Sequence, residues 1–305
     1  MLRTAIGSLD LDSPILTASG TFGHDPSALA FLQAGDLGAL VLKTVTPEPR
    51  HGNPPQRMAE FPGGVINAIG LENKGLAYWR DHVAPELEGL PVPVVANAGG
   101  HSTADYVAMT EAFDAMQGVA AIELNLSCPN VQGGIQFSTD ATALENVVKH
   151  CRAVTKKPLW VKLSPNVASI VPFAKASEAS GADALTVSNT LMGMLVDWRK
   201  RKPVLANGTG GMSGPAVRPL VLRLVWESAR AVDIPVIASG GASSAEDVLD
   251  YVVAGATAVQ VGTAVFRRPG VISEIAADLR RLLKEESTSL EQLRSSLDWP
   301  HPLSC

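Results

Sequence analysis

The sequence predicts an α/β fold, a single (β/α)8 TIM barrel with long insertions after strands 2, 4 and 6. Three observations indicate it. Short apolar, β-branched runs alternate with amphipathic stretches along the chain, the runs are apolar on both faces, and glycine or proline marks their ends. Eight such units suggest closure into a barrel, and the length of 305 residues suits one barrel with insertions. We find no linker, so we expect residues 1–305 to form one domain.

The eight expected strands are 14–19, 39–44, 92–97, 121–127, 159–164, 184–189, 235–239 and 258–263. The clearest helical stretches between them are 104–116, 143–154, 167–180 and 216–232. Two long segments rich in glycine, proline or asparagine interrupt this order, at 45–74 and 190–215. Loops of this length in a compact domain are usually lids or binding loops. Both follow the carboxyl end of a strand, where barrel enzymes place their active sites.

Composition narrows the classes of function. Hydrophobic residues make up 46% of the chain and charged residues 18%, which permits a large core. The net charge is −5 and aromatic residues are only 5%, so we expect no nucleic-acid partner. The short basic run at 199–202 reads as a solvated loop rather than an anion site.

The chain has three cysteines, Cys128, Cys151 and Cys305. They are too few for a disulfide framework, and an iron–sulfur cluster needs about four thiolates. We see no apolar run of membrane-spanning length and no signal peptide at the start. We therefore expect a cytoplasmic protein with no membrane association and no metal site.

Polar and small residues gather where the predicted strands end. They are Ser19, Lys43, Thr44, Asn97, Asn125, Lys162, Asn189, Thr190, Gly240, Gly241, Gly262 and Thr263. A buried lysine is costly unless an anion pairs with it or it loses its proton. Internal ion pairs, for example with Glu123, are one interpretation, and ligand binding at the strand ends is the one we favour. Several amides suit a flat heterocycle with alternating C=O and N–H groups, although one alone is usually a turn or cap residue.

The last two strands end in small residues, in the segments ASGGASSAED (238–247) and VGTAVF (261–266). Backbone N–H groups there can approach a phosphate, which barrels often bind after strands seven and eight. Two ordinary tight turns are the alternative. Ser243 and Glu246 have capping-box spacing and predict a helix start. A third glycine cluster, at 208–214, can close over the same ligand.

Cys128 lies beyond the fourth strand. A lone cysteine is usually a small buried hydrophobe. At the functional face of a barrel it can instead act as a general base if its pKa is near the working pH. Spacing alone does not decide between these readings.

Taken together, the motifs resemble those of the class 1 dihydroorotate dehydrogenases, in order from the first strand to the last. The matching segments are ASGTFG (18–23), VLKTVT (41–46), NAIGLENKG (67–75), ELNLSCPN (123–130), VKLSPN (161–166), SNT (188–190), GGMSGP (210–215), SGGASSAED (239–247) and VGTAVF (261–266). Cys128 looks like the 1A and 1B branches rather than the variants with a serine base. Lys43, Thr44, PRHGNPPQR (49–57) and VQGGIQFSTD (131–140) look like the NAD+-linked 1B branch. Lys74 replaces a usual proline and Ser188 a usual aliphatic residue.

The resemblance implies oxidation of dihydroorotate to orotate on one FMN per chain, in the synthesis of UMP. Cys128 would be the catalytic base that removes the C5 proton while the C6 hydride passes to flavin N5. The residues implied to hold dihydroorotate are Lys43, Asn67, Ala68, Ile69, Gly70, Leu71, Asn125, Asn130, Asn189 and Thr190. Those implied to bind FMN are Ser19, Lys43, Thr44, Asn97, Asn125, Lys162, Ser188, Gly214, Gly240, Gly241, Gly262 and Thr263. Lys162 would lie at the N1/O2 edge of the flavin, and the 131–140 loop would act as a lid.

In the 1B branch electrons leave through a second subunit that carries FAD and a [2Fe–2S] cluster. The resemblance therefore implies a heterotetramer built on a homodimer of this chain. Rival readings are a 1A-like homodimer that reduces fumarate, a hydroxy-acid oxidase and a non-catalytic flavin-binding barrel. The oxidases rely on a histidine base, and none of the six histidines falls on a strand end. A scaffold has no need of a thiol or of so many amides.

Overall fold

Eight parallel strands form the central sheet of this computed structural model, which describes residues 2–24, 26–33, 35–127 and 137–299. In chain order they are β3 (Ile15–Thr17), β4 (Leu40–Val41), β7 (Val94–Ala98), β8 (Ala121–Asn125), β9 (Leu159–Lys162), β10 (Ala184–Val187), β15 (Val236–Ser239) and β16 (Ala258–Val261). Their order in the sheet is β3-β16-β15-β10-β9-β8-β7-β4. A parallel bridge from Leu16 to Ala39 joins the two ends, so the sheet is a nearly closed barrel. The fold class predicted from the sequence is confirmed.

The closing seam between β3 and β4 depends on a side chain as well as on backbone pairing. The Thr17 hydroxyl donates to the Val41 carbonyl at 3.0 Å and accepts from the Val41 N–H at 2.7 Å. Thr17 is fully buried. Its hydroxyl therefore takes the place of a ladder bond where the two strands diverge.

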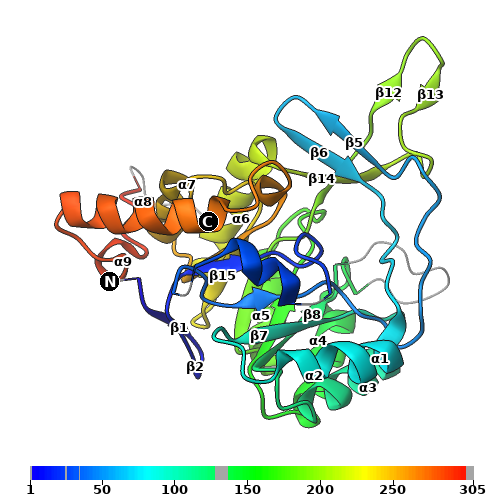
Figure 1. The fold of residues 1–305 in the computed structure, drawn as a ribbon, viewed down its shortest axis with the longest axis horizontal. Coiled ribbons are helices and arrows are strands. Elements are labelled where there is room, and N and C mark those ends of the chain that lie inside the picture. The colour runs from blue at the N-terminus through cyan, green and yellow to red at the C-terminus, as the bar shows by residue number, and fades with distance from the viewer. Residues whose placement is uncertain (1, 25, 34, 128–136, 300–305) are drawn as a thin grey trace.

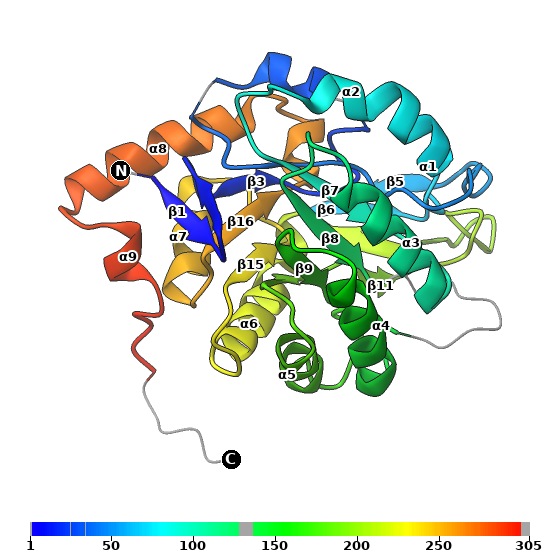
Figure 2. The same ribbon diagram turned by 90° about the horizontal axis from the view of Figure 1, so that it is seen from below.

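Helices surround the barrel, as Figure 2 shows for α3 to α8. They are α3 (Thr103–Asp114), α4 (Ala141–Ala153), α5 (Val171–Ala179), α6 (Arg218–Ala229), α7 (Ala245–Val253) and α8 (Val271–Glu285), with α9 (Leu290–Leu293) after them. A continuous helical segment runs through α1 (Gly75–Tyr78), η2 (Trp79–Val83) and α2 (Ala84–Leu87), and short turns are η1 (Pro26–Phe31), η3 (Pro215–Val217) and η4 (Thr263–Phe266). The outward strand residues and the inner helix faces form the larger core. None of the helices in the described part of the chain is long and apolar enough to cross a membrane.

Two layers of side chains fill the barrel interior, because alternate strand residues point inward. The apolar layer contains Leu16, Ala39, Val41, Val95, Ala121, Trp160, Ala184, Ile237 and Ala258. The polar layer lies nearer the carboxyl ends and contains Asn97, Glu123, Lys162, Thr186 and Gln260, all buried. The N-terminal hairpin of β1 (Thr4–Ile6) and β2 (Leu9–Leu11) adds Ile6 and Leu11 to the apolar layer. This hairpin was not predicted from the sequence.

The two insertions form a sheet of their own at the carboxyl end of the barrel (Figure 1). The first contributes β5 (Met58–Phe61) and β6 (Gly64–Asn67), and the second β11 (Leu191–Gly193) and β14 (Gly210–Ser213). They pair in the order β11-β14-β6-β5, with Gly211 opposite Asn67. β12 (Val196–Asp197) and β13 (Lys202–Pro203) form a projecting hairpin. The two segments that we predicted as loops are therefore antiparallel strands that pair with each other.

Part of the insertion after the fourth barrel strand, β8, lies outside the described residues. Most of the 131–140 segment, which was expected to act as a lid, belongs to this part. Where the chain is described again, Phe137 and Ser138 are buried, and Phe137 packs edge-on against Tyr106. Asp140 then caps α4. The capping box predicted at Ser243 and Glu246 is wrong by one residue, because Ser244 and Asp247 form it.

Candidate active site

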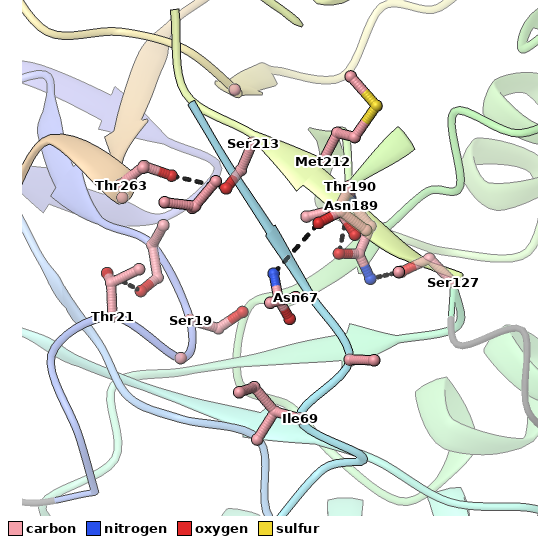
Figure 3. Close-up of a pocket in the computed structure, with 18 of the residues that line it drawn as sticks. Ser19, Thr21, Asn67, Ile69, Ser127, Asn189, Thr190, Met212, Ser213 and Thr263 are labelled. Carbon is pink, nitrogen blue, oxygen red and sulfur yellow. Dashed lines mark hydrogen bonds between the residues drawn. The ribbon is translucent and has the colours of Figure 1, made fainter. Parts of the chain in front are cut away.

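A cavity of about 470 Å³ opens at the carboxyl ends of the barrel strands, under the insertion sheet. The barrel side of its wall comes from the segments that follow the strands, and the opposite side from β6 and β14. Figure 3 shows side chains from these elements directed around one space. Its size is within the range of about 300–1,000 Å³ usual for small-molecule and cofactor sites.

Lys162, at the end of β9, lies at the bottom of the cavity. It is 4% exposed, and its ammonium donates to the Ser19 hydroxyl at 3.2 Å and to Gln260 Oε1 at 3.5 Å. Desolvation lowers the pKa of Lys162, and the negative charge of Glu123 opposes that shift. The internal ion pair considered from the sequence is therefore indirect, because an amide lies between the two charges.

Lys43 follows β4 and is half-buried in the wall. Its backbone N–H donates to the Gly23 carbonyl at 2.9 Å, and the residue lines the cavity. Burial lowers the pKa of Lys43, the carboxylate of Glu72 raises it and the guanidinium of Arg57 lowers it. Arg57 and Glu72 form an ion pair beside it. The cavity therefore holds two lysines in different electrostatic surroundings.

A chain of hydrogen bonds orders the amides. Asn125 Nδ2 donates to the Thr44 hydroxyl at 3.1 Å, and Asn125 Oδ1 accepts from the Ser127 hydroxyl at 2.8 Å. Asn189 Nδ2 donates to Ser127 Oγ at 2.6 Å (Figure 3), and Thr190 N–H donates to Asn189 Oδ1. These bonds fix the direction of each amide, so the groups are oriented before a ligand binds.

The segment 67–71 lines the other side of the cavity. Asn67 Nδ2 donates to the Gly211 carbonyl at 3.3 Å, across the paired insertions. Asn53 Nδ2 donates to the Ala68 carbonyl at 2.9 Å and Arg50 Nε to the Gly70 carbonyl at 3.3 Å. Leu71 has a φ of 55°, which is uncommon for a residue with a branched side chain. The surrounding bonds hold this segment in its shape.

Two glycines after β15 form a concave turn. Gly240 has a φ of 152° and Gly241 a φ of 79°, and a Cβ on Gly241 would lie 2.9 Å from the Gly214 carbonyl oxygen. Within the described residues, the N–H groups of Gly240 and Gly241 donate to no acceptor, and both glycines line the cavity. Thr263, after β16, donates its hydroxyl to Ser213 Oγ at 2.8 Å and lines the same end. Free backbone donors at this place suit a phosphate.

The structure brings most of the predicted residues together around the cavity. Those that line it are Ser19, Lys43, Thr44, Asn67, Ala68, Ile69, Gly70, Leu71, Asn125, Lys162, Ser188, Asn189, Thr190, Gly240, Gly241, Gly262 and Thr263. Two others do not reach its wall. Asn97 lies in the polar layer and donates to Glu123, and the Gly214 carbonyl lies close to Gly241. Cys128 and Asn130 lie outside the described residues.

The cavity is also lined by side chains that were not predicted from the sequence. Asn53, Arg57 and Glu72 come from the first insertion, and Asn166 and Gln260 from the barrel. Asn166 anchors the second insertion, since its Nδ2 donates to the Thr190 carbonyl and its Oδ1 accepts from Met192 N–H. A signal was available for Gln260, a polar residue within the apolar run AVQV. No comparable signal marked the insertion residues, whose placement depends on strand pairing.

Comparisons with known proteins agree on one family. The family model described as dihydroorotate dehydrogenase matches residues 1–283. The chain is 50% identical over 285 residues to the dihydroorotate dehydrogenase B (NAD(+)) catalytic subunit of Trichlorobacter lovleyi, which covers 93% of this chain and 94% of that protein. Proteins of the same name match from Geobacillus kaustophilus, at 47% identity over 93% of this chain and 91% of the relative, and from Phocaeicola vulgatus, at 44% over 97% and 99%.

Proposed function

The chain belongs to the dihydroorotate dehydrogenase family, and from this premise we propose that it oxidises dihydroorotate to orotate in pyrimidine biosynthesis, with FMN in the barrel cavity as hydride acceptor. It is an oxidoreductase by family membership. The relatives named above are catalytic subunits linked to NAD+. The observation that supports the proposal is the cavity, which has free backbone N–H groups at Gly240 and Gly241 and the buried ammonium of Lys162.

The residues present fit FMN. The free N–H groups of Gly240 and Gly241, with Gly262 and Thr263 beside them, suit its phosphate. At the other end, Lys162 offers positive charge for the pyrimidine edge of a flavin, where charge tunes its chemistry. When bound, FMN would supply the site that accepts the hydride from C6 of dihydroorotate.

Substrate binding is assigned to Lys43, the 67–71 segment and the ordered amides. Lys43 would attract the carboxylate of dihydroorotate, and Asn67, Asn125 and Asn189 would pair with the C=O and N–H groups of its ring. Thr190 lies beside them and would complete the wall. Since these groups are oriented by protein contacts, little ordering remains to be done when the substrate binds.

We assign removal of the C5 proton to Cys128. Cys128 lies outside the described residues, but Ser127, the residue before it, is described. Ser127 is buried and bonded to both Asn125 and Asn189, so the chain leaves β8 at the cavity wall. A thiolate placed there would take the proton while Asn130 contacts the ring.

Electron exit is assigned to a partner. We propose a homodimer of this chain within a cytoplasmic heterotetramer whose second subunit carries FAD and a [2Fe–2S] cluster. The name "catalytic subunit" of the relatives supports a partner, and three cysteines are too few to bind a cluster.

The test separates cofactor, substrate and acceptor. Heat release from the purified chain should give FMN, about one per chain, and anaerobic dihydroorotate should bleach its absorbance. The isolated chain should reduce artificial dyes but hardly NAD+, and NAD+ reduction should appear on adding the reductase subunit. Release of FAD or of no flavin contradicts the cofactor assignment. Efficient turnover with fumarate by the chain alone would move the assignment to a homodimeric enzyme without the partner.

A further inference from the structure

A fully buried carboxylate lies below the cavity, in the polar layer of the barrel. Both oxygens of Glu123 accept hydrogen bonds, Oε1 from Asn97 Nδ2 at 2.6 Å and Oε2 from the Thr186 hydroxyl at 2.6 Å. Oε2 also accepts from Gln260 Nε2 at 2.8 Å. Glu123 does not line the cavity, so it does not touch a ligand there.

Gln260 connects this carboxylate to the cavity. It is 1% exposed, and its Oε1 accepts from the Lys162 ammonium at 3.5 Å while its Nε2 donates to Glu123. An ammonium can only donate, so the amide oxygen must face Lys162 and the NH2 group must face the carboxylate. β8 and β16 are not neighbours in the sheet, so the bond between Glu123 and Gln260 crosses the barrel interior.

Charge explains why such an arrangement would be kept. A buried ammonium is destabilised by the loss of water, and within the described residues Lys162 makes two polar contacts, both with neutral groups. Among the described residues, Glu123 is the charged side chain that acts on it, and it raises the pKa that burial lowers. A neutral Lys162 would offer no charge to a ligand.

We propose that Glu123, acting through Gln260, is a positioning residue that keeps Lys162 charged and directed into the cavity. This rests on the proposed function only in what Lys162 then does, which is to stabilise negative charge at one edge of the bound flavin. The Glu123 carboxylate lies below the cavity and does not line it, so it cannot repel the substrate directly. Glu123 and Lys162 form no direct ion pair, and Gln260 joins them through one hydrogen bond to each.

The charge state of Lys162 can be followed directly in the full-length protein. The chain is labelled with ¹³C at lysine Cε, and the Lys162 signal is assigned by its absence in Lys162→Met. Glu123→Gln keeps the shape and removes the charge, so Lys162 should lose its proton about one pH unit lower, or more. Gln260→Met keeps the Glu123 charge and breaks the connection, and it should shift Lys162 in the same direction. An unchanged titration in both variants overturns the proposal.

Thr186→Val is the matched control. It removes one donor from the same carboxylate but does not lie between Glu123 and Lys162. A purely structural role predicts that all three variants lower the unfolding temperature and leave the Lys162 titration alone. The proposal predicts that Thr186→Val shifts the titration least. If Glu123→Gln does not fold, Gln260→Met decides, with Glu123→Asp as the variant that keeps the charge and should keep Lys162 protonated.

A second readout uses the bound flavin without turnover. Loss of positive charge at Lys162 should make the midpoint potential of the flavin more negative in Glu123→Gln and Gln260→Met, and should leave Thr186→Val close to wild type. A chain that binds no FMN would refute the proposed function, whereas the Lys162 titration would still decide the role of Glu123. An unchanged potential together with a shifted titration would overturn the link between Lys162 and the flavin.

Discussion

The two ends of the barrel interior are built from the same strands, but one is filled by apolar side chains and the other by polar and charged ones. At the amino end, Trp160 and Ile237 pack in the apolar layer, and the β1–β2 hairpin covers them. One inward position further along the strands, Glu123, Lys162 and Gln260 form the polar layer under the cavity. A shift of two residues along a strand therefore changes the environment from a packed core to a buried network of charge. The comparison suggests that stability and chemistry are separable in this barrel, because each depends on a different layer.

The largest expected effect is on the rate of the reaction, and the substitution that causes it leaves the apolar layer unchanged. Cys128→Ala should slow reduction of the bound flavin by dihydroorotate by about 10²–10⁴-fold, the range for loss of a general base. Substrate affinity should change little, because Lys43 and the asparagines are assigned to binding. Anaerobic stopped-flow absorbance measures both.

Cys151 provides the control. Cys151 is fully buried on α4, and burial raises the pKa of its thiol to about 11, so it is not a base at neutral pH. Cys151→Ala should lower the unfolding temperature and retain the reduction rate. If Cys128→Ala reduces the flavin as fast as Cys151→Ala does, Cys128 is a packing residue.

The second prediction concerns the apolar layer at the amino end of the barrel. Trp160 is fully buried in the apolar layer, so Trp160→Ala should lower the free energy of unfolding by about 3–5 kcal/mol, as large-to-small core substitutions do. Flavin release and the reduction rate of the folded fraction should stay near wild type. Chemical denaturation followed by flavin fluorescence measures stability, and stopped flow measures the rate.

A smaller change at the same position refines this prediction. Trp160 Nε1 has no hydrogen-bond partner within the described structure. Trp160→Phe removes that unpaired N–H and keeps most of the volume, so it should cost under about 1.5 kcal/mol. A reduction rate that falls as far as stability does in Trp160→Ala would show that the two layers are coupled.

Local patterns in the sequence were enough to predict the barrel and most of the cavity. Lys43, Asn125, Lys162 and Asn189 were found because strand ends in a barrel converge whatever the details of packing. Gln260 was missed because it lies within a strand, one inward position below the end. Asn97, taken as a wall residue from its place at a strand end, belongs to the polar layer instead.

The insertion sheet could not be predicted in the same way. The paired residues Asn67 of β6 and Gly211 of β14 are 144 positions apart in the sequence, and β14 has the sequence GGMS, which has low strand propensity. Pairing with β6 stabilises it as a strand. Arg57 and Glu72 reach the cavity only because this pairing folds the first insertion over the barrel. Their role was therefore outside what periodicity can show.

The smallest expected effect would sharpen the comparison within the polar end itself, since Lys162 and Lys43 are charged by different means. Burial lowers the pKa of Lys43, and Glu72 opposes this from the insertion. Glu72→Gln removes the negative charge, so the pKa of Lys43 should fall further and the ammonium should be lost at lower pH. Because the ammonium is assigned to the substrate carboxylate, the alkaline fall of kcat/KM for dihydroorotate should move to lower pH, by less than about one unit. Glu60→Gln is the control, because Glu60 is exposed on β5, pairs with Arg267 and does not line the cavity. Its profile should match wild type. A shift of the Glu72→Gln profile to higher pH would mean that Arg57, freed from its ion pair, controls substrate binding in place of Lys43.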